Sequence, residues 1–305
     1  MVDVLLATYN GEAYLREMID SLLKQTMQDF HVYIRDDGST DGTAVIIEGF
    51  RQAYPDKFTV ICDDLSFGNA RDNFFALLPY AKQEYVMFAD QDDIWLPDKI
   101  ELAVSTMEIA RDDLGDGPLL AHSDLTVVGE NGAVIHPSLF SLQKLDPERL
   151  YLNQLLSQNN ITGCTMLMNR PLVEIIRTSG EALMHDWWIG LVAAAFGHIV
   201  VAPNRIHYRQ HHANAVGAKD VKSASYFRQK LANTGGIRES IRATYRQAEA
   251  FLQIYRDLLD DEQQDLIRVF TSLGEQSALK RMRLLSRYKL YKSGAYRKIG
   301  QIIYG

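Results

Sequence analysis

The chain has little cysteine and no long apolar run, and both absences narrow what it can be. Two cysteines among 305 residues, Cys62 and Cys164, lack the spacing of a zinc site or a disulfide framework. We expect both to be buried free thiols in a reducing compartment. The apolar stretch from Ile189 to Ala202 is interrupted by a Gly-His pair, so it predicts a core helix and a strand rather than a membrane span. Met1 leads straight into a strand pattern, so no signal peptide is expected.

Negative charge prevails over most of the chain, but the C-terminal segment is basic. Asp and Glu number 39 against 32 Lys and Arg, for a formal net charge of −7, which disfavours binding to nucleic acid. From Arg281 onward there is no acid, and seven basic residues are interleaved with leucine, isoleucine and tyrosine. The segment 281–304 therefore predicts a cationic amphipathic helix. Two interpretations stay open: a helix at an anionic membrane surface, or a helix docked on the body with solvated cations.

Apolar runs and helical patterns alternate at short intervals in the N-terminal part. Strand-like runs are found at residues 2–7, 31–35, 58–62 and 85–89. Helical apolar spacing follows the first three runs, which predicts an α/β protein with a doubly wound, mainly parallel sheet flanked by helices. The loops at 8–12, 36–43 and 90–93 then meet at the carboxyl edge of the sheet, where such folds bind ligands.

Three carboxylates follow the strand at 85–89. Asp90, Asp92 and Asp93 offer the hard oxygen ligands that suit Mg²⁺ or Mn²⁺, ions usually shared with substrate phosphates. The alternative is a solvated acidic turn in which Asp93 caps a helix that Pro97 opens. An Asp-x-Asp pattern is weak by itself, but its convergence with two other loops at one sheet edge favours a nucleotide site with a metal ion.

Six sequence motifs together resemble those of a known protein family. They are Ala-Thr-Tyr-Asn-Gly at 7–11, Ile-Arg-Asp-Asp-Gly-Ser-Thr-Asp-Gly-Thr at 34–43, Asp-Gln-Asp-Asp-Ile-Trp-Leu-Pro at 90–97, Ile-Thr-Gly-Cys-Thr-Met at 161–166, His-Asp-Trp-Trp at 185–188 and Tyr-Arg-Gln-His-His-Ala-Asn-Ala-Val-Gly at 208–217. In them the chain resembles the family 2 glycosyltransferases of GT-A fold, most sharply the bacterial rhamnosyltransferases that build rhamnan and O-antigen chains. The resemblance covers 1–220, the expected glycosyltransferase domain. Residues 221–305 are expected to form a helical C-terminal extension with a basic amphipathic tail.

The resemblance implies roles for individual residues. Asp186 stands where the family keeps its general base. Asp92 and His211 stand at positions of metal ligands, with Asp93 as the alternative ligand. The residues implied to bind the nucleotide are Thr8, Asn10, Glu12, Asp36, Arg71 and Asp90. The residues implied to bind the acceptor or the sugar are Thr162, Gly163, Trp187, Trp188 and Asn214.

These assignments have structural alternatives. Without the resemblance, Asp186 is better explained as a helix cap whose neighbouring tryptophans belong to the core. Arg71 is equally well explained as a surface arginine at a helix start. Either Asp36 or Asp37 can cap the helix that follows Gly38.

The resemblance implies an inverting transferase that depends on Mg²⁺ or Mn²⁺. It would move L-rhamnose from dTDP-β-L-rhamnose to a hydroxyl of a growing, lipid-linked cell-surface polysaccharide. Such an enzyme is expected in the cytoplasm, bound peripherally to the inner face of the cell membrane; a homodimer stays open. The alternatives are another UDP- or dTDP-sugar donor, a nucleotidyltransferase, and a non-catalytic carbohydrate-binding protein. The loop at 8–12 lacks the Lys or Arg of a phosphate-binding loop, which disfavours the nucleotidyltransferase.

Overall fold

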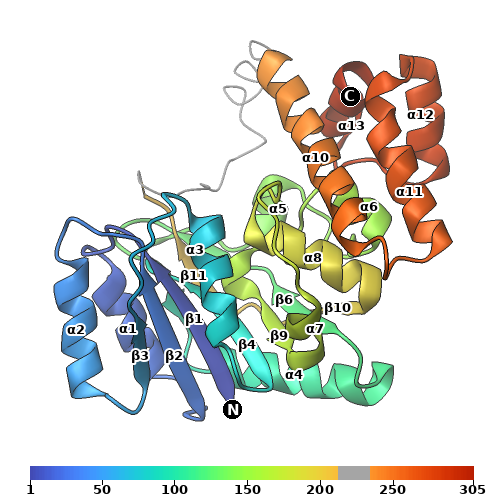
Figure 1. Ribbon diagram of the computed structural model, residues 1–305. Helices are drawn as coiled ribbons and strands as arrows, with labels where there is room; N and C mark the ends of the chain where they lie inside the picture. Colours follow the sequence, from blue (N-terminus) through green and yellow to red (C-terminus); the bar gives the residue numbers. More distant parts are fainter. Residues whose placement is uncertain (212–233) are drawn as a thin grey trace.

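The computed structural model describes residues 1–211 and 234–305 as an α/β body with helices at its C-terminal end (Figure 1). The strands are β1 (Val2–Thr8), β2 (Phe30–Asp36), β3 (Phe58–Ile61), β4 (Tyr85–Asp90), β5 (Ile94–Trp95), β6 (Leu119–Ser123), β7 (Thr126–Val128), β8 (Val134–His136), β9 (Leu167–Asn169), β10 (His198–Ala202) and β11 (Ile206–Arg209). The helices are α1 (Leu15–Leu23), α2 (Thr43–Ala53), α3 (Ala70–Leu77), α4 (Lys99–Leu114), α5 (Leu139–Gln143), α6 (Leu152–Ser157), α7 (Arg170–Ile175), α8 (His185–Phe196), α10 (Thr234–Tyr255), α11 (Asp261–Thr271), α12 (Ala278–Arg287) and α13 (Ala295–Tyr304). Short 3-10 turns are η1 (Leu78–Tyr80), η2 (Gly163–Thr165) and η3 (Ser272–Glu275).

The predicted mainly parallel sheet is confirmed. In the part of the chain that the structure describes, its order is β10-β6-β9-β4-β1-β2-β3, and a smaller sheet has the order β5-β11-β7-β8. Every neighbouring pair of the larger sheet is parallel except those of β9, which runs antiparallel to β4 and β6. Thr8 pairs with Asp36, and Ala7 pairs with Asp90. The ends of β1, β2 and β4 therefore lie side by side, as the loop argument requires.

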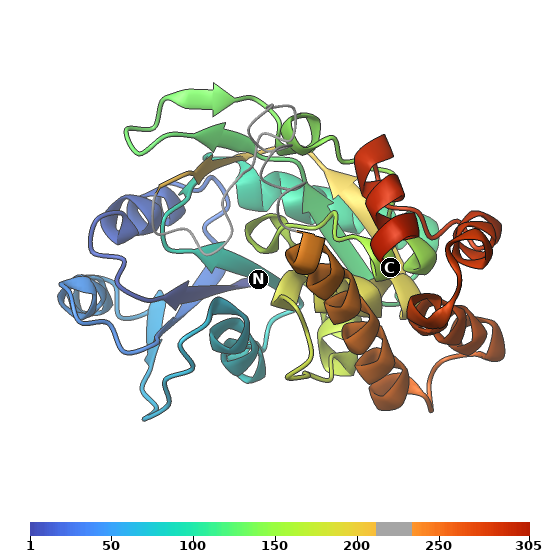
Figure 2. The ribbon, with the colours of Figure 1, turned by 90° about the horizontal axis from the view of Figure 1, so that it is seen from above.

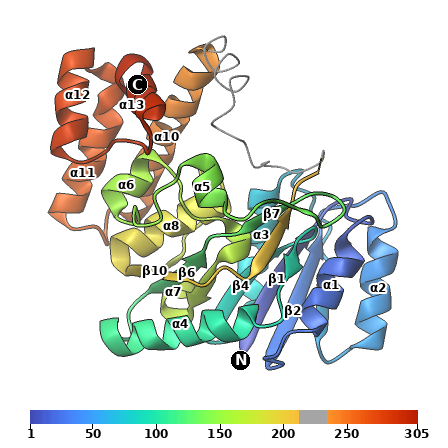
Figure 3. The same ribbon diagram turned by 180° about the vertical axis from the view of Figure 1, so that it is seen from behind.

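Strand β1 is buried on both faces, which explains its continuous apolar run. Leu5 belongs to a core that includes Phe74 of α3, whereas Leu6 belongs to a second core that includes Met18 of α1 and Met107 of α4. Seen from above, α10 to α13 gather at the end of the molecule opposite α1 and α2 (Figure 2). Seen from behind, α4 runs along β6 and β10 (Figure 3).

The C-terminal helices share the core of α3 and α8. Trp188 of α8 packs against Phe251 and Tyr255 of α10, with ring centroids 5.4 and 6.3 Å apart. Leu285 of α12 belongs to the same hydrophobic cluster. The domain boundary predicted at residue 220 lies outside the described residues. None of the helices in residues 1–211 and 234–305 combines the length and apolar character that a bilayer span needs.

Two local predictions, on the tail and on Cys62, are wrong, and so is the alternative role of Asp93 as a helix cap. The tail is not one helix over 281–304, because α12 ends at Arg287 and Gly294, with φ of 81°, precedes α13. In the segment between them Lys289 has a φ of 53°, and Leu290 is fully buried in the core. After the acidic loop, β5 precedes α4, so Asp93 does not cap the helix. Of the two cysteines, Cys164 is buried but Cys62 is exposed at the end of the edge strand β3.

Candidate active site

A pocket of about 570 Å³ opens at the carboxyl edge of the main sheet, a volume that suits a small-molecule ligand. Some of the predicted site residues line it: Thr8, Asp90, Asp92, Thr162, Gly163, Asp186 and Trp187. The strand ends supply one side of the pocket, and η2 with the start of α8 supplies the other. The chain thus brings together side chains from motifs nearly 180 residues apart.

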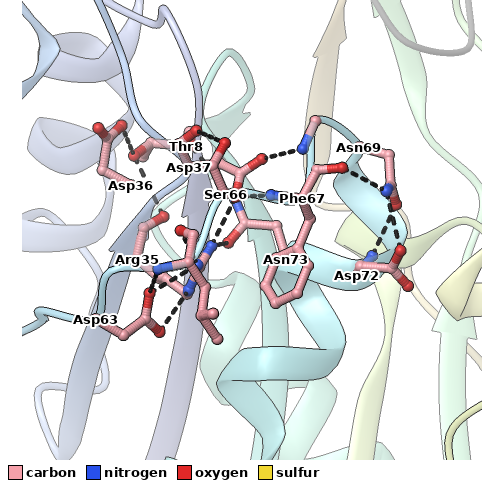
Figure 4. Close-up of polar contacts among 12 residues, drawn as sticks. Thr8, Arg35, Asp36, Asp37, Asp63, Ser66, Phe67, Asn69, Asp72 and Asn73 are labelled. Carbon is pink, nitrogen blue, oxygen red and sulfur yellow. Dashed lines mark hydrogen bonds and ion pairs between the residues drawn. The ribbon is translucent and has the colours of Figure 1, made fainter.

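One end of the pocket is organised by Arg35, near the end of β2 (Figure 4). Its buried guanidinium donates to Asp37 Oδ1 at 2.9 Å and to Asn73 Oδ1 at 2.8 Å. Asp37 also accepts the backbone N–H groups of Phe67 and Gly68 at 2.9 and 2.7 Å. The guanidinium lies 4.7 Å from the centroid of the Phe67 ring. These bonds fasten the loop after β3 beside the pocket.

Asp37, rather than the predicted Asp36, lines this end. Asp36 accepts from Thr8 Oγ1 at 2.8 Å and from the backbone N–H of Ser39 at 2.9 Å, so it joins the first two loops. Neighbouring residues in extended backbone point to opposite sides, and the sequence does not reveal which of the two faces the ligand. The signal available was the alternation of Phe30, Val32 and Ile34 with more polar residues in β2, and it ends with the strand at Asp36.

Besides Asp36, three predicted nucleotide residues, Asn10, Glu12 and Arg71, are not among those that line the pocket. Asn10 Oδ1 accepts the backbone N–H of Thr40 at 2.8 Å, and Glu12 Oε2 accepts that of Gly42 at 2.9 Å. Both side chains therefore hold the first loop against the second. Arg71 pairs with its neighbour Asp72 at 2.7 Å and donates to the carbonyl oxygens of residues 180 and 182. These bonds join α3 to the segment before α8. Arg71 therefore has a structural role at the start of α3, in line with the alternative to nucleotide binding.

The acidic loop concentrates negative charge. Desolvation of the carboxyl group, followed by repulsion from Asp92 and Asp186, raises the pKa of Asp90 to about 7. Burial, followed by repulsion from Asp92 and Asp90, raises the pKa of Asp93 well above its ordinary value. His211 Nε2 lies 2.7 Å from Asp92 Oδ2. A divalent cation would relieve this repulsion.

The donor atoms at this loop fit a divalent cation. Oδ2 of Asp93 is buried and has no hydrogen-bond partner among the described residues. Ligand atoms of Asp90, Asp93 and Cys164 lie within 4.8 Å of one another. With the adjacent imidazole of His211 and carboxylate of Asp92, the loop offers mostly hard oxygen donors, which suit Mg²⁺ or Mn²⁺ better than a soft ion. Which of these carboxylates coordinates stays a prediction.

Asp186 lies in the first turn of α8, and its carboxylate is held by three donors. It accepts the backbone N–H of Trp187 at 2.5 Å, that of Gly163 at 3.1 Å and the amide of Asn159 at 3.1 Å. Only 8% of the residue is exposed, and burial raises the pKa of Asp186 to about 7 despite these bonds. A carboxyl group with that pKa in a ligand pocket suits a general base at neutral pH.

The two tryptophans after Asp186 have different surroundings. Trp187 lines the pocket, and its indole N–H donates to the carbonyl of Leu155 at 2.6 Å. Trp188 is fully buried, donates to the carbonyl of Arg177 at 2.8 Å and belongs to the core. A helix turns by about 100° per residue, so adjacent side chains cannot both face the pocket. Asn214 lies outside the described residues.

Several residues of the pocket wall were not predicted from the sequence. Tyr9 and Gln91 line it. The Gln91 side-chain amide accepts the backbone N–H of Tyr9 at 2.8 Å and donates to the backbone carbonyl of Tyr9 at 2.9 Å. Asn159 and Asn160 also line it. Single amide residues in loops form no periodic pattern. The only available signal for this pair was its place directly before the Ile-Thr-Gly motif at 161–163.

Solved structures of other proteins share the fold of this chain. The crystal structure of residues 1–349 of S. aureus TarS in complex with UDP superposes on this chain with a TM-score of 0.56 at 18% identity. The superposition covers 94% of this chain and 79% of that one. A mannosyltransferase from Pyrobaculum calidifontis in complex with GDP-Man and Mn²⁺ has a TM-score of 0.50 at 15% identity, covering 99% of this chain and 86% of that one. At these identities the likeness establishes the GT-A fold alone.

Sequence comparison is more specific. A dTDP-rhamnosyl transferase of Shigella flexneri, RfbG, is 28% identical over 253 residues, which are 77% of this chain and 82% of the relative. A UDP-Glc:alpha-D-GlcNAc-diphosphoundecaprenol beta-1,3-glucosyltransferase of Escherichia coli, WfgD, is 24% identical over 57% of this chain and 62% of the relative. The sequence model of "Glycosyl transferase family 2" matches residues 3–175, more than half of the chain. The protein belongs to glycosyl transferase family 2 and transfers a sugar from a nucleotide-sugar donor.

Proposed function

We propose that the protein is an inverting rhamnosyltransferase that uses dTDP-β-L-rhamnose. The observation that carries the reaction type is the joint placement of Asp186, with its pKa raised to about 7, and the acids Asp90 and Asp92 in one pocket. The 28% identical Shigella flexneri relative, named as a dTDP-rhamnosyl transferase, supports the donor. The Escherichia coli relative, whose printed acceptor is a diphosphoundecaprenol-linked sugar, supports a lipid-linked acceptor.

The proposed reaction is a single displacement. An acceptor hydroxyl attacks the anomeric carbon of rhamnose on the face opposite the diphosphate. Asp186 takes the hydroxyl proton while the new C–O bond forms and the bond to the diphosphate breaks. The nucleoside diphosphate leaves with both electrons of that bond, and the configuration changes from β to α. Trp187, beside the base, offers an apolar ring face to a sugar.

The nucleotide and the metal belong at the strand ends in this proposal. Thr8 and Asp37 line the end that we assign to the nucleotide, with Asp90 toward the ribose or the donor sugar. Asp92 and His211 would hold Mg²⁺ or Mn²⁺, which supplies Lewis-acid neutralisation of the departing diphosphate. Asn10, Glu12 and the other loop residues act indirectly, by keeping the two loops joined.

A panel of sugar nucleotides with Mn²⁺ tests the donor by thermal shift. Ligand at about a hundred times its Kd adds about 2.7 kcal/mol to the free energy of unfolding, or several degrees in Tm for a chain of this size. dTDP-rhamnose is expected to give the largest shift, above dTDP alone and above UDP- and GDP-sugars. A larger Tm shift with another sugar nucleotide would identify that compound as the donor in place of dTDP-rhamnose. The proposed reaction type would not be affected by that result.

We also propose that the exposed face of α13 binds the membrane that carries the acceptor. Tyr296, Ile299 and Ile303 recur at helical spacing and are 59%, 53% and 55% exposed. Arg297 on the same helix donates to the carbonyl oxygen of Gln143 at 3.0 Å, and Gln143 lines the pocket. The apolar stripe is therefore close to the wall of the active site.

The charge around this stripe matches an anionic lipid surface. Residues 276–305 contain no acid. The exposed cations of α12, α13 and the segment between them are Lys280, Arg283, Arg287, Lys289 and Lys298. Each basic residue near such a surface contributes about 1 kcal/mol. Arg281 does not count among them, because its buried guanidinium bonds the carbonyl oxygens of Leu273 and Gln276, each at 2.9 Å.

Sedimentation with vesicles tests the membrane face. The wild-type protein should sediment with phosphatidylcholine vesicles only when they contain phosphatidylglycerol, and less so at high salt. The double variant Ile299→Ser/Ile303→Ser should lose this binding. Val134→Ser/Ile135→Ser is the matched control, because both residues are 59% exposed on the distant strand β8. Failure of the wild-type protein to bind anionic vesicles at low salt would rule out the membrane as the partner of this face.

A further inference from the structure

Within residues 1–211 and 234–305, the carboxylate of Asp186 accepts two backbone hydrogen bonds and one from a side chain, that of Asn159. Asn159 Nδ2 donates to Asp186 Oδ1 at 3.1 Å and to the carbonyl of Ile161 at 2.8 Å. Asn159 Oδ1 accepts the backbone N–H of Ile161 at 2.9 Å. This acceptor bond fixes the orientation of the amide, so that its NH₂ group faces the carboxylate. Asn159 is thus locked in the one orientation that can donate to Asp186.

Three residues that precede Asn159, in α6 and directly after it, are bonded to the C-terminal part of the chain. Ser157 Oγ donates to the carbonyl of Leu290 at 2.5 Å, and Gln158 Oε1 accepts the backbone N–H of Ser293 at 2.7 Å. One turn earlier in α6, Asn153 Nδ2 donates to the carbonyl of Tyr288 at 3.0 Å. All three partners lie in the linker between α12 and α13, which we define as residues 288–294.

Helix α13 also bonds the linker, through the side chain of Gln301. Gln301, only 2% exposed, donates to the carbonyl of Leu290 at 2.9 Å and to Ser157 Oγ at 3.2 Å. Its Oε1 accepts the backbone N–H of Lys292 at 3.0 Å. A buried polar network of this kind rigidifies the segments that it joins, because breaking any bond leaves a desolvated group without a partner. The linker and the end of α6 therefore move as one unit.

We propose that Asn159 is the positioning residue of the general base and that the 288–294 linker holds Asn159 in place. The C-terminal helices would then act on the chemical step from outside the sheet, through the linker, the end of α6 and the Asn159 amide. This inference rests on the proposed function, because it takes Asp186 as the base. It differs from the docking role of the same helices, since it concerns the face of α12 and α13 that is turned toward the body.

Loss of the Asn159 amide should affect the base in two ways. The amide stabilises the ionised carboxylate, so its removal raises the pKa of Asp186 further above about 7. The other ionisable groups near Asp186 are Asp90 on β4, which repels the carboxylate, and the neighbouring His185, whose burial lowers its pKa to about 3 and keeps it neutral. Neither replaces the lost donor. The carboxylate also becomes free to turn away from the attacking hydroxyl.

The test compares Asn159→Ala and Gln158→Ala with Gln263→Ala. Gln263 is the matched control, because its amide also joins the C-terminal helices to the body, donating to the carbonyl of Ala195 at 2.7 Å, but at the far end of α8. The readouts are kcat, the pH dependence of kcat/KM, donor affinity and Tm. We expect Asn159→Ala to lower kcat at least about tenfold and to move the acid limb of kcat/KM up by about one pH unit.

Gln158→Ala should change kcat and the acid limb of kcat/KM in the same direction but by less. Gln263→Ala should lower Tm but keep the wild-type kcat and the wild-type acid limb of kcat/KM. Donor affinity should stay near the wild-type value in all three. If Asn159→Ala keeps the wild-type kcat and limb, Asn159 does not position the base. If Gln158→Ala behaves like Gln263→Ala, the linker has no such role; this also decides the linker's part should Asn159→Ala fail to fold. If Asp186→Asn is active in the same assay, the proposed function fails instead.

Discussion

Asp186→Asn should reduce sugar transfer by at least about a thousandfold and leave donor binding almost unchanged. General-base catalysis contributes about 10² to 10⁴ in rate, and the isosteric amide cannot accept the acceptor's proton. Donor affinity should persist because the base assists the transition state rather than the ground state. The measurements are kcat from nucleoside diphosphate release and Kd of the donor by calorimetry.

Asp265→Asn is a suitable control for this variant, because Asp265 is exposed on α11 and its ion pair among the described residues is with Arg268 of the same helix, at 2.8 Å. It should turn over like the wild-type enzyme. If Asp186→Asn binds donor tenfold worse yet turns over normally, Asp186 has a structural role at the start of α8, and the base must be sought elsewhere in the pocket.

Asp92→Asn should lower transfer by at least about a hundredfold, and excess chelator should do the same to the wild-type enzyme. The expected cause is loss of the cation that neutralises both the acidic loop and the departing diphosphate. A readout independent of turnover is the effect of Mn²⁺ on Tm, which should rise in the wild-type protein and stay flat in the variant.

Asp64→Asn serves as the control for the metal experiment, because Asp64 is an exposed acid in the loop after β3, outside the pocket lining. It should keep both activity and the response to Mn²⁺. Full activity of the wild-type enzyme in excess chelator would show that transfer does not need the ion, and the acidic loop would then have another role.

The sheet and the meeting of its loops followed from the sequence, whereas several side-chain assignments did not. Alternating apolar runs fix the order of strands and helices, and parallel strands bring Thr8 and Asp90 to one edge whatever their contacts. The side that a residue faces just beyond a strand or within a buried helix depends on packing partners far away in the chain. This is why Asp37 rather than Asp36 lines the pocket and why Trp188 lies in the core.

The C-terminal region shows the same limit at longer range. Its basic, apolar pattern predicted a single helix over 281–304, whereas two helices, α12 and α13, form there. The break before Gly294 and the burial of Arg281 are accompanied by contacts with α6, η3 and α13, which no local pattern encodes. Asn159 was missed for the same reason: its contact with Asp186 spans 27 residues in the sequence and involves a lone amide in a loop.

The configuration of the product tests the central claim most directly. The purified protein would be incubated with dTDP-β-L-rhamnose, Mn²⁺ and a saccharide acceptor, and the new anomeric centre would be assigned by NMR while the released nucleotide is identified. We predict an α-rhamnosyl product formed together with free dTDP. A β-rhamnosyl product would contradict single displacement at Asp186, and release of pyrophosphate in place of dTDP would identify a nucleotidyltransferase instead.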